Sequence, residues 1–152
     1  RKVVQAWVDN LAVAPFSSDS AALKAVKSGQ CDVTLVNTYY FARMEAEGQH
    51  GSLKLFWPNQ SNRGVHINIS GAGLIKHSDN KAAAIDFVEW LVQLTPQQTL
   101  AHLSLEFPVH QQAKPSEQVR AWGDFSKDVM PLTKIARHQR QAVQLMDEVG
   151  YK

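Results

Sequence analysis

The sequence predicts a domain of the α/β class, in which helices pack against a sheet. Within the first 50 residues, a helical pattern, a strand pattern and a second helical pattern follow one another. The strand pattern is Asp32-Val33-Thr34-Leu35-Val36, a short run rich in β-branched residues. The 152 residues are 44% hydrophobic and 20% charged, so the chain can bury a core and intrinsic disorder is not expected.

Helices are predicted on both sides of this strand. Residues 1–11 carry apolar side chains at helical spacing. A cluster of serines and an aspartate at 17–20 offers N-caps for a helix over 21–28, with Gly29 as its expected stop. After the strand, Asn37 is expected to cap a third helix, which runs to about Glu47 and ends at Gly48.

The middle of the chain favours strands and the last part favours helices. Residues 53–57 and the alternating segment 64–69 are predicted strands. A long helix is expected over about 80–94, and Thr95 is expected to be the N-cap of the next one. The last predicted helix covers about 132–149.

Composition and charge argue against several classes of function. The 16 basic and 14 acidic residues are interspersed and give a net charge of +2, so no basic stripe points to nucleic acid or an anionic membrane. Apolar runs stay far below the roughly 20 residues of a membrane-spanning helix, and no signal-peptide pattern is present. Cys31 is expected to be a buried small residue. The helix pattern that opens the chain has no N-cap residue before it, which hints at a longer protein.

The candidate ligand site directly follows the predicted strand 32–36. With Asn37 as N-cap, Tyr39 and Tyr40 fall in the first helical turn, at the strand end where open α/β sheets bind ligands. The unpaired N–H groups and the dipole of that turn favour anions. A phenol titrates near pH ~10 in water, but a trivalent metal favours the phenolate, a hard oxygen ligand that suits ferric iron. Tyrosines after a strand also often pack their rings in a core, so the pattern alone leaves both interpretations open.

Three blocks of the sequence resemble the periplasmic ferric-iron-binding proteins. They are Gly29–Met44 with its tyrosine pair, Arg63–Gly73 and Leu145–Gly150, and they occur in the family's order across most of the chain. The resemblance implies the carboxyl-terminal half of a type II periplasmic solute-binding fold, in which Tyr39 and Tyr40 bind Fe(III).

The same resemblance implies a division of the chain between two lobes. Residues 1–68 form a second-lobe segment that carries the tyrosine pair, 69–121 return to the first lobe, and 122–152 are carboxyl-terminal helices packing on the second lobe. The other iron ligands would lie in the amino-terminal half, for which this chain has no counterpart.

A co-bound anion, carbonate or phosphate, is also implied near the tyrosines. Asn37 matches a family position that contacts the anion, and Asp19 stands near another, where an asparagine would suit an anion better. Arg43, four residues past Tyr39 on the same helix face, either balances phenolate charge or is a plain surface residue. The implied function is to bind ferric iron in the periplasm and deliver it to an inner-membrane ABC permease, with no enzymatic activity.

Two other classes of function compete with this one. The same fold could bind a small anion, a polyamine or a sugar phosphate, with the tyrosines only lining the cleft. A hydrolase lacks a coherent nucleophile and base, and Ser70 does not stand in a nucleophile-elbow pattern. No two histidines are spaced i, i+4, so no helix presents a ready metal pair; the six are His50, His66, His77, His102, His110 and His138.

Overall fold

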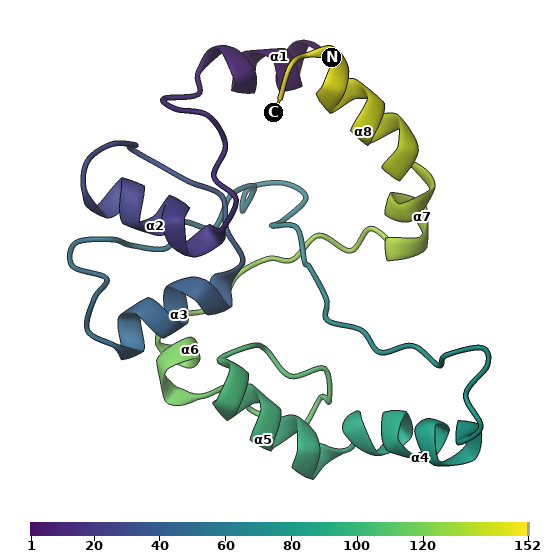
Figure 1. Cartoon of the computed structure of the whole chain (residues 1–152). Coiled ribbons are helices and arrows are strands. Elements are labelled where there is room, and N and C mark those ends of the chain that lie inside the picture. Colours follow the sequence, from purple (N-terminus) through teal and green to yellow (C-terminus); the bar gives the residue numbers. More distant parts are fainter. Residues whose placement is uncertain (152) are drawn as a thin grey trace. The chain divides into compact units, whose positions relative to one another are not determined.

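The computed structural model describes residues 1–151, and Lys152, the last residue of the predicted segment 122–152, lies outside the described residues. The described part contains eight helices (Figure 1). In chain order they are α1 (Lys2–Asp9), α2 (Asp19–Lys27), α3 (Thr38–Ala46), α4 (Lys81–Leu91), α5 (Leu94–Ser104), α6 (Glu117–Ala121), α7 (Leu132–Arg137) and α8 (Gln139–Glu148).

Helix α3 begins and ends where the sequence signals predict, whereas α2 begins at Asp19, two residues before the predicted start at Ala21. The Ser18 hydroxyl caps α2 by accepting from the Ala21 N–H at 3.2 Å. Asn37 occupies the N-cap position of α3. Gly29 and Gly48 follow the two helices with φ of +76° and +67°, a left-handed backbone that glycine adopts without strain.

The predicted start of α5 is wrong by two positions. Gln93, and not Thr95, is the N-cap residue, and the helix begins at Leu94. Pro96 therefore occupies the third helical position, where it is buried. The shift is possible because the first-turn N–H groups of a helix have no helical partner, so a proline there removes no helical hydrogen bond.

The single helix predicted over 132–149 is also wrong, because it is two helices. His138 separates α7 from α8 with φ −93° and ψ −2°. Its N–H donates to the Ile135 carbonyl three residues back, at 2.9 Å, which tightens the turn. His138 Nδ1 lies 3.2 Å from the Gln141 amide oxygen, so the side chain is engaged at the junction as well.

Pro108 and Pro115 predict a loop in this region, so the sequence does not predict the short helix α6. Ser116 is its N-cap and accepts from the Val119 N–H at 3.3 Å. Both Ser116 and Val119 are buried.

The predicted strands do not form ladders within residues 1–151. Segments 32–36 and 53–57 are irregular, and within 64–69 only Val65 pairs, in an isolated parallel bridge with Lys127. A strand requires a neighbouring strand for its N–H and C=O groups, and no such neighbour lies beside these segments in the described chain. Their large apolar side chains are correspondingly exposed: Val33 at 84%, Leu35 at 88% and Phe56 at 83%.

The chain divides into two compact units that interleave in sequence. Unit 1 contains Arg1–Val36, Gly51–Val65 and the chain from Ser126 onward, whereas unit 2 contains Asn37–His50 and His66–Phe125. The predicted lobe segments 1–68, 69–121 and 122–152 were inferred from the family resemblance and remain a prediction.

The core of unit 2 lies between α3 and α6, which are side by side (Figure 1). Phe41, Ala42 and Met44 of α3 and Val119 of α6 are buried, with Ala42 and Val119 fully enclosed. This packing fixes one face of the helix that carries the tyrosine pair.

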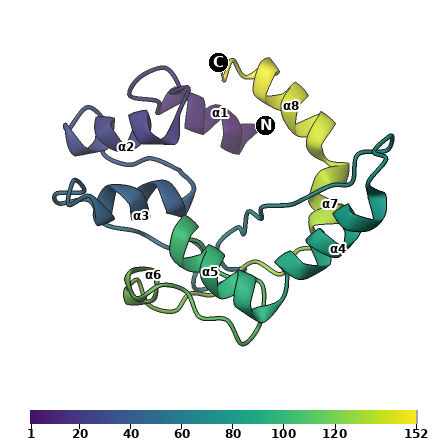
Figure 2. The same cartoon turned by 60° about the horizontal axis from the view of Figure 1, so that its bottom comes forward.

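Helix α4 differs, because none of its residues is buried. Val92 and Gln93 alone separate it from α5 (Figure 2). Phe87 and Trp90 stack with ring centroids 5.8 Å apart, yet both are about half exposed.

No helix in residues 1–151 has the length and apolar character that a membrane crossing requires.

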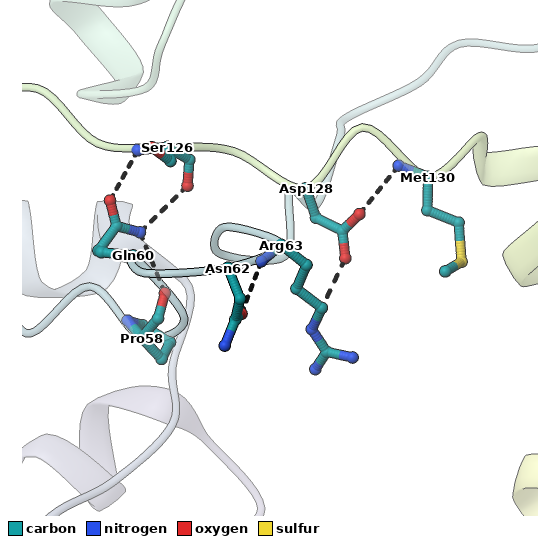
Figure 3. A network of polar contacts seen from close by, with 7 residues as sticks. All are labelled: Pro58, Gln60, Asn62, Arg63, Ser126, Asp128 and Met130. Carbon is teal, nitrogen blue, oxygen red and sulfur yellow. Dashed lines mark hydrogen bonds and ion pairs between the residues drawn. The ribbon is translucent and has the colours of Figure 1, made fainter.

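In unit 1, the loop 58–65 holds the segment that begins at Ser126. The Gln60 side chain accepts from the Ser126 N–H at 2.7 Å and donates to the Ser126 carbonyl at 3.1 Å. Figure 3 shows both bonds and the Arg63–Asp128 ion pair of 3.9 Å beside them. Gly64 is buried with φ +85°, and a Cβ there would lie 2.5 Å from the Ser126 carbonyl oxygen, so only glycine fits.

Candidate metal centre

Tyr39 and Tyr40 lie in the first turn of α3, as predicted. Asn37 has extended backbone angles (φ −70°, ψ 138°), and Thr38 is the first helical residue. The Tyr40 N–H donates to the Asn37 carbonyl at 3.2 Å. The first turn of this fully described helix contains no acidic residue. The positive end of the helix dipole therefore favours a negative charge beside the tyrosines.

The two phenol rings form a tilted stack. Their centroids are 4.3 Å apart and their planes meet at 33°. Consecutive residues of a helix point about 100° apart around its axis, so this stacking shows that both side chains turn toward the same side. Both are half-buried, neither sealed in the core nor fully in water. One helical turn thus presents two phenol groups together.

The Arg43 guanidinium lies over the same pair. Its Cζ is 5.2 Å from the Tyr39 ring centroid and 5.9 Å from that of Tyr40. A cation over an aromatic face is attracted by the ring quadrupole, and its charge also has the sign that stabilises an anionic oxygen. Arg43 is therefore a direct neighbour of the tyrosines, although its side chain remains exposed.

Asn37 is at the predicted cap position, but its side chain makes no capping hydrogen bond to α3. Its Oδ1 accepts from Asn68 Nδ2 at 2.8 Å. Asn68 was predicted only as part of the strand-like segment 64–69, and nothing in the local sequence indicates this contact. The bond therefore connects the segment after Val65 to the N-terminus of α3.

The second candidate anion contact, Asp19, belongs to unit 1. It is half-buried and is the first residue of α2, directly after the N-cap Ser18. This position stabilises a carboxylate through the helix dipole, which is a local role. A contact of Asp19 with an anion near the tyrosines stays a prediction.

Other metal-binding side chains do not gather elsewhere in the described chain. Within residues 1–151, no three His, Cys, Asp or Glu side chains are arranged to hold a metal ion. His110 and His138 make hydrogen-bond contacts of 3.2 Å with near neighbours in sequence. Cys31 is half-buried and carries a free thiol. The tyrosine pair is therefore the strongest candidate that the described residues offer.

Glu45, on the same helix as the tyrosines, accepts long-range hydrogen bonds that the sequence does not predict. Its carboxylate accepts hydrogen bonds from Gln118 and Trp122, which lie 73 and 77 residues further along the chain. Partners at that separation leave no local signal in the sequence.

This chain is similar to known proteins both by family and by overall sequence. The family model described as bacterial extracellular solute-binding protein matches residues 1–127. The chain is 36% identical over 152 residues to iron uptake protein A1 of Synechocystis, an alignment that covers 96% of this chain and 42% of that protein.

Solved structures match over nearly the whole chain. The ferric binding protein from Campylobacter jejuni is 34% identical with a TM-score of 0.92, over 98% of this chain and 49% of that one. A Trichodesmium protein solved in complex with iron and citrate ligands is 34% identical with a TM-score of 0.89, over 97% and 49%. The chain thus spans about half the length of these relatives. The predicted fold class, a partial type II periplasmic solute-binding fold, is confirmed, although the residues described here supply its helices and not its sheet ladders.

Proposed function

Because the chain belongs to the bacterial extracellular solute-binding protein family, we propose that it binds ferric iron in the periplasm and delivers it to an inner-membrane ABC permease. Tyr39 and Tyr40 are the proposed metal ligands. Family members are binding proteins, and the proposal includes no catalytic step.

One observation carries this proposal: the stacked tyrosine pair in the first turn of α3, with centroids 4.3 Å apart. Two phenolates are hard, anionic donors, and hard oxygen ligands suit a small trivalent cation. The helix dipole and Arg43, 5.2 Å from the Tyr39 ring, both supply positive charge that offsets the two phenolates. Such compensation matters because two adjacent anions otherwise repel each other.

The relatives support iron as the ligand. One is an iron uptake protein, another is a ferric binding protein, and a third was solved with iron and citrate. Since the chain spans about half of each, we propose that the counterpart of their amino-terminal half supplies the remaining iron ligands. Two phenolates alone leave most of the coordination sphere of ferric iron to solvent or to an anion.

A co-bound carbonate or phosphate is part of the proposal, with Asn37 as its candidate contact, while a contact with Asp19 remains a prediction from the family resemblance. The support is local. Asn37 lies at the N-terminus of α3, where backbone N–H groups favour anions. A carboxylate at Asp19 would repel a nearby anion, so a cation or a proton would have to accompany any contact there.

Iron release follows from the same ligand chemistry. Transfer of one electron from a reductant outside this chain would give ferrous iron, which carries less charge and is poorly served by phenolates. A change at the metal alone would therefore lower the affinity of the site.

The test is a titration of the chain with ferric nitrilotriacetate, followed by visible absorption. Iron bound by phenolate gives a charge-transfer band, which we expect in the unchanged chain and not in the double variant Tyr39→Phe/Tyr40→Phe. A colourless complex, or a band that survives the double substitution, would overturn the proposal. Calorimetry with phosphate and a polyamine, run in parallel without iron, detects the alternative in which the tyrosines only line a cleft for another solute.

A further inference from the structure

We propose that Glu45 is a positioning residue for the tyrosine pair, because it fixes the rotation of α3 against α6. Its Oε2 accepts from Gln118 Nε2 at 2.8 Å and from the Trp122 indole Nε1 at 3.0 Å. The inference rests on the proposed iron site at Tyr39 and Tyr40, which stand at the other end of the same nine-residue helix.

The setting of Glu45 makes these two bonds strong. Glu45 is half-buried, and both bonds are partly shielded from water. A shielded carboxylate requires partners, and hydrogen bonds to an ionised group are roughly twice as strong as neutral ones. In the described chain, the partners of this carboxylate are two N–H donors and not a mobile surface cation. The bonds are therefore directional as well as strong.

Gln118 adds a second attachment one turn earlier on α3. The same Nε2 atom donates to the Ala42 carbonyl at 2.7 Å. One amide group of α6 therefore bonds to α3 at Ala42 and at Glu45. Apolar burial of the α3 face is non-directional, whereas bonds at two points along the helix determine its rotation about its own axis.

Trp122 connects this attachment to the tyrosine end of the helix. Its ring centroid is 6.0 Å from that of Phe41, the residue directly after Tyr40, and 6.3 Å from that of Phe107. The indole therefore contacts α3 twice, through Glu45 at one end and Phe41 at the other. A displacement of Glu45 would be transmitted through a rigid aromatic ring to the turn that carries the tyrosines.

Rotation matters for metal binding because ligand atoms must be held within about 0.5 Å of their working positions. The phenol oxygens lie at the ends of long side chains, far from the helix axis, so a small rotation of α3 produces a large displacement at the oxygens. Glu45 acts on the metal only through this geometry and is not itself a proposed ligand.

The experiment compares three variants of the chain by titration with ferric nitrilotriacetate. Glu45→Ala removes the acceptor, Glu45→Gln keeps an acceptor oxygen without the charge, and Glu47→Ala removes an exposed carboxylate at the end of the same helix as a matched control. We expect Glu45→Ala to weaken iron binding about tenfold and to shift the phenolate-to-iron band, and Glu45→Gln to stay within about threefold of the unchanged chain. Glu47→Ala should leave both readouts unchanged.

Several outcomes separate this inference from the proposed function. If the chain without substitutions shows no phenolate-to-iron band, both the proposed iron site and the role of Glu45 are refuted. A normal band in which Glu45→Ala and Glu47→Ala behave alike refutes only the role of Glu45. If Glu45→Ala loses its helical circular dichroism signal, the Trp122→Phe variant is used to test the role of Glu45. It keeps an aromatic ring beside Phe41 but removes the N–H, so the same band shift is expected and an unshifted band overturns the inference.

Discussion

The rings of Tyr39 and Tyr40 stack 4.3 Å apart although the two residues are consecutive on a helix. Consecutive helical side chains do not usually face each other, so the arrangement requires both side chains to bend toward one side. The Arg43 guanidinium lies 5.2 Å from one ring centroid and 5.9 Å from the other. A stacked pair with a cation over it is suited to carry two negative charges on adjacent phenol groups once a metal is bound.

Single substitutions in this pair should each weaken iron binding. Tyr39→Phe or Tyr40→Phe removes one oxygen donor, and we expect a loss of affinity of at least about tenfold per residue with a weaker visible band. Loss of one hydroxyl should change the free energy of unfolding without iron by less than about 1 kcal/mol. Competition with nitrilotriacetate and chemical denaturation measure the two effects. Tyr151→Phe is the matched control, since it removes the phenol hydroxyl of a tyrosine outside the proposed ligand pair, and a comparable loss there would contradict the assignment.

Gly64→Ala should destabilise the fold strongly. Gly64 has φ +85°, and a Cβ would lie 2.5 Å from the Ser126 carbonyl oxygen, which is backbone and cannot turn aside. Left-handed strain and the steric clash together should lower the free energy of unfolding by about 2–4 kcal/mol. Gly71→Ala is the control, because nothing lies within 4 Å of a Cβ at that position. Equal denaturation midpoints for the two variants would refute this account.

Ser18→Ala should remove the cap of α2. The Ser18 hydroxyl accepts from the Ala21 N–H at 3.2 Å, and loss of such a cap typically lowers stability by about 1 kcal/mol. The neighbouring Ser17→Ala, which removes a hydroxyl outside the cap position, should stay within about 0.5 kcal/mol. Thermal or urea unfolding of both variants checks the difference. A larger effect at Ser17 would mean that the cap lies elsewhere.

The amino-terminal half of iron uptake protein A1, added as a separate polypeptide, should complete the site. The oxygen ligands that we propose for this half should raise the iron affinity on the order of tenfold or more. Binding should also cover exposed apolar residues such as Val33, Leu35 and Phe56, which lowers the fluorescence of a hydrophobic dye. With the Tyr39→Phe/Tyr40→Phe variant, the dye signal should still fall while the gain in iron affinity disappears. A half that changes neither signal would refute the proposed partner.

The helices that the sequence predicted well are those whose signals are local. Ser18 and Asn37 mark the starts of α2 and α3, and Gly29 and Gly48 mark their ends, because capping and left-handed turns depend on a few consecutive residues. The start of α5 was misplaced for a related reason. A proline fits several positions of a first turn equally well.

The strands could not be predicted correctly, because a strand depends on partners that its own residues do not specify. The run from Val33 to Val36 has the composition of a buried strand, but composition fixes neither the neighbour nor the register. Among the predicted strand residues within 1–151, only Val65 pairs, with Lys127, more than 60 positions away.

For the candidate site, the tyrosine pair followed from the sequence and its surroundings did not. The motif placed Tyr39 and Tyr40 in the first turn of a helix. The bond between Asn37 and Asn68 is a tertiary feature, and the stacking of the two rings depends on side-chain rotamers that the order of residues does not specify. Glu45 gave no sign of its role, since both of its donors lie more than 70 residues later in the chain.

The bonds between Gln60 and Ser126 also determine when unit 1 can finish folding during synthesis. The two residues are 66 positions apart, and all of His66–Phe125, the larger part of unit 2, is made between them. The ribosome therefore completes the sequence of unit 2 before the segment that closes unit 1 has emerged. Closing so long a loop carries an entropic penalty that slows folding. The early part of unit 1 therefore stays incompletely assembled until the segment that begins at Ser126 has been synthesised.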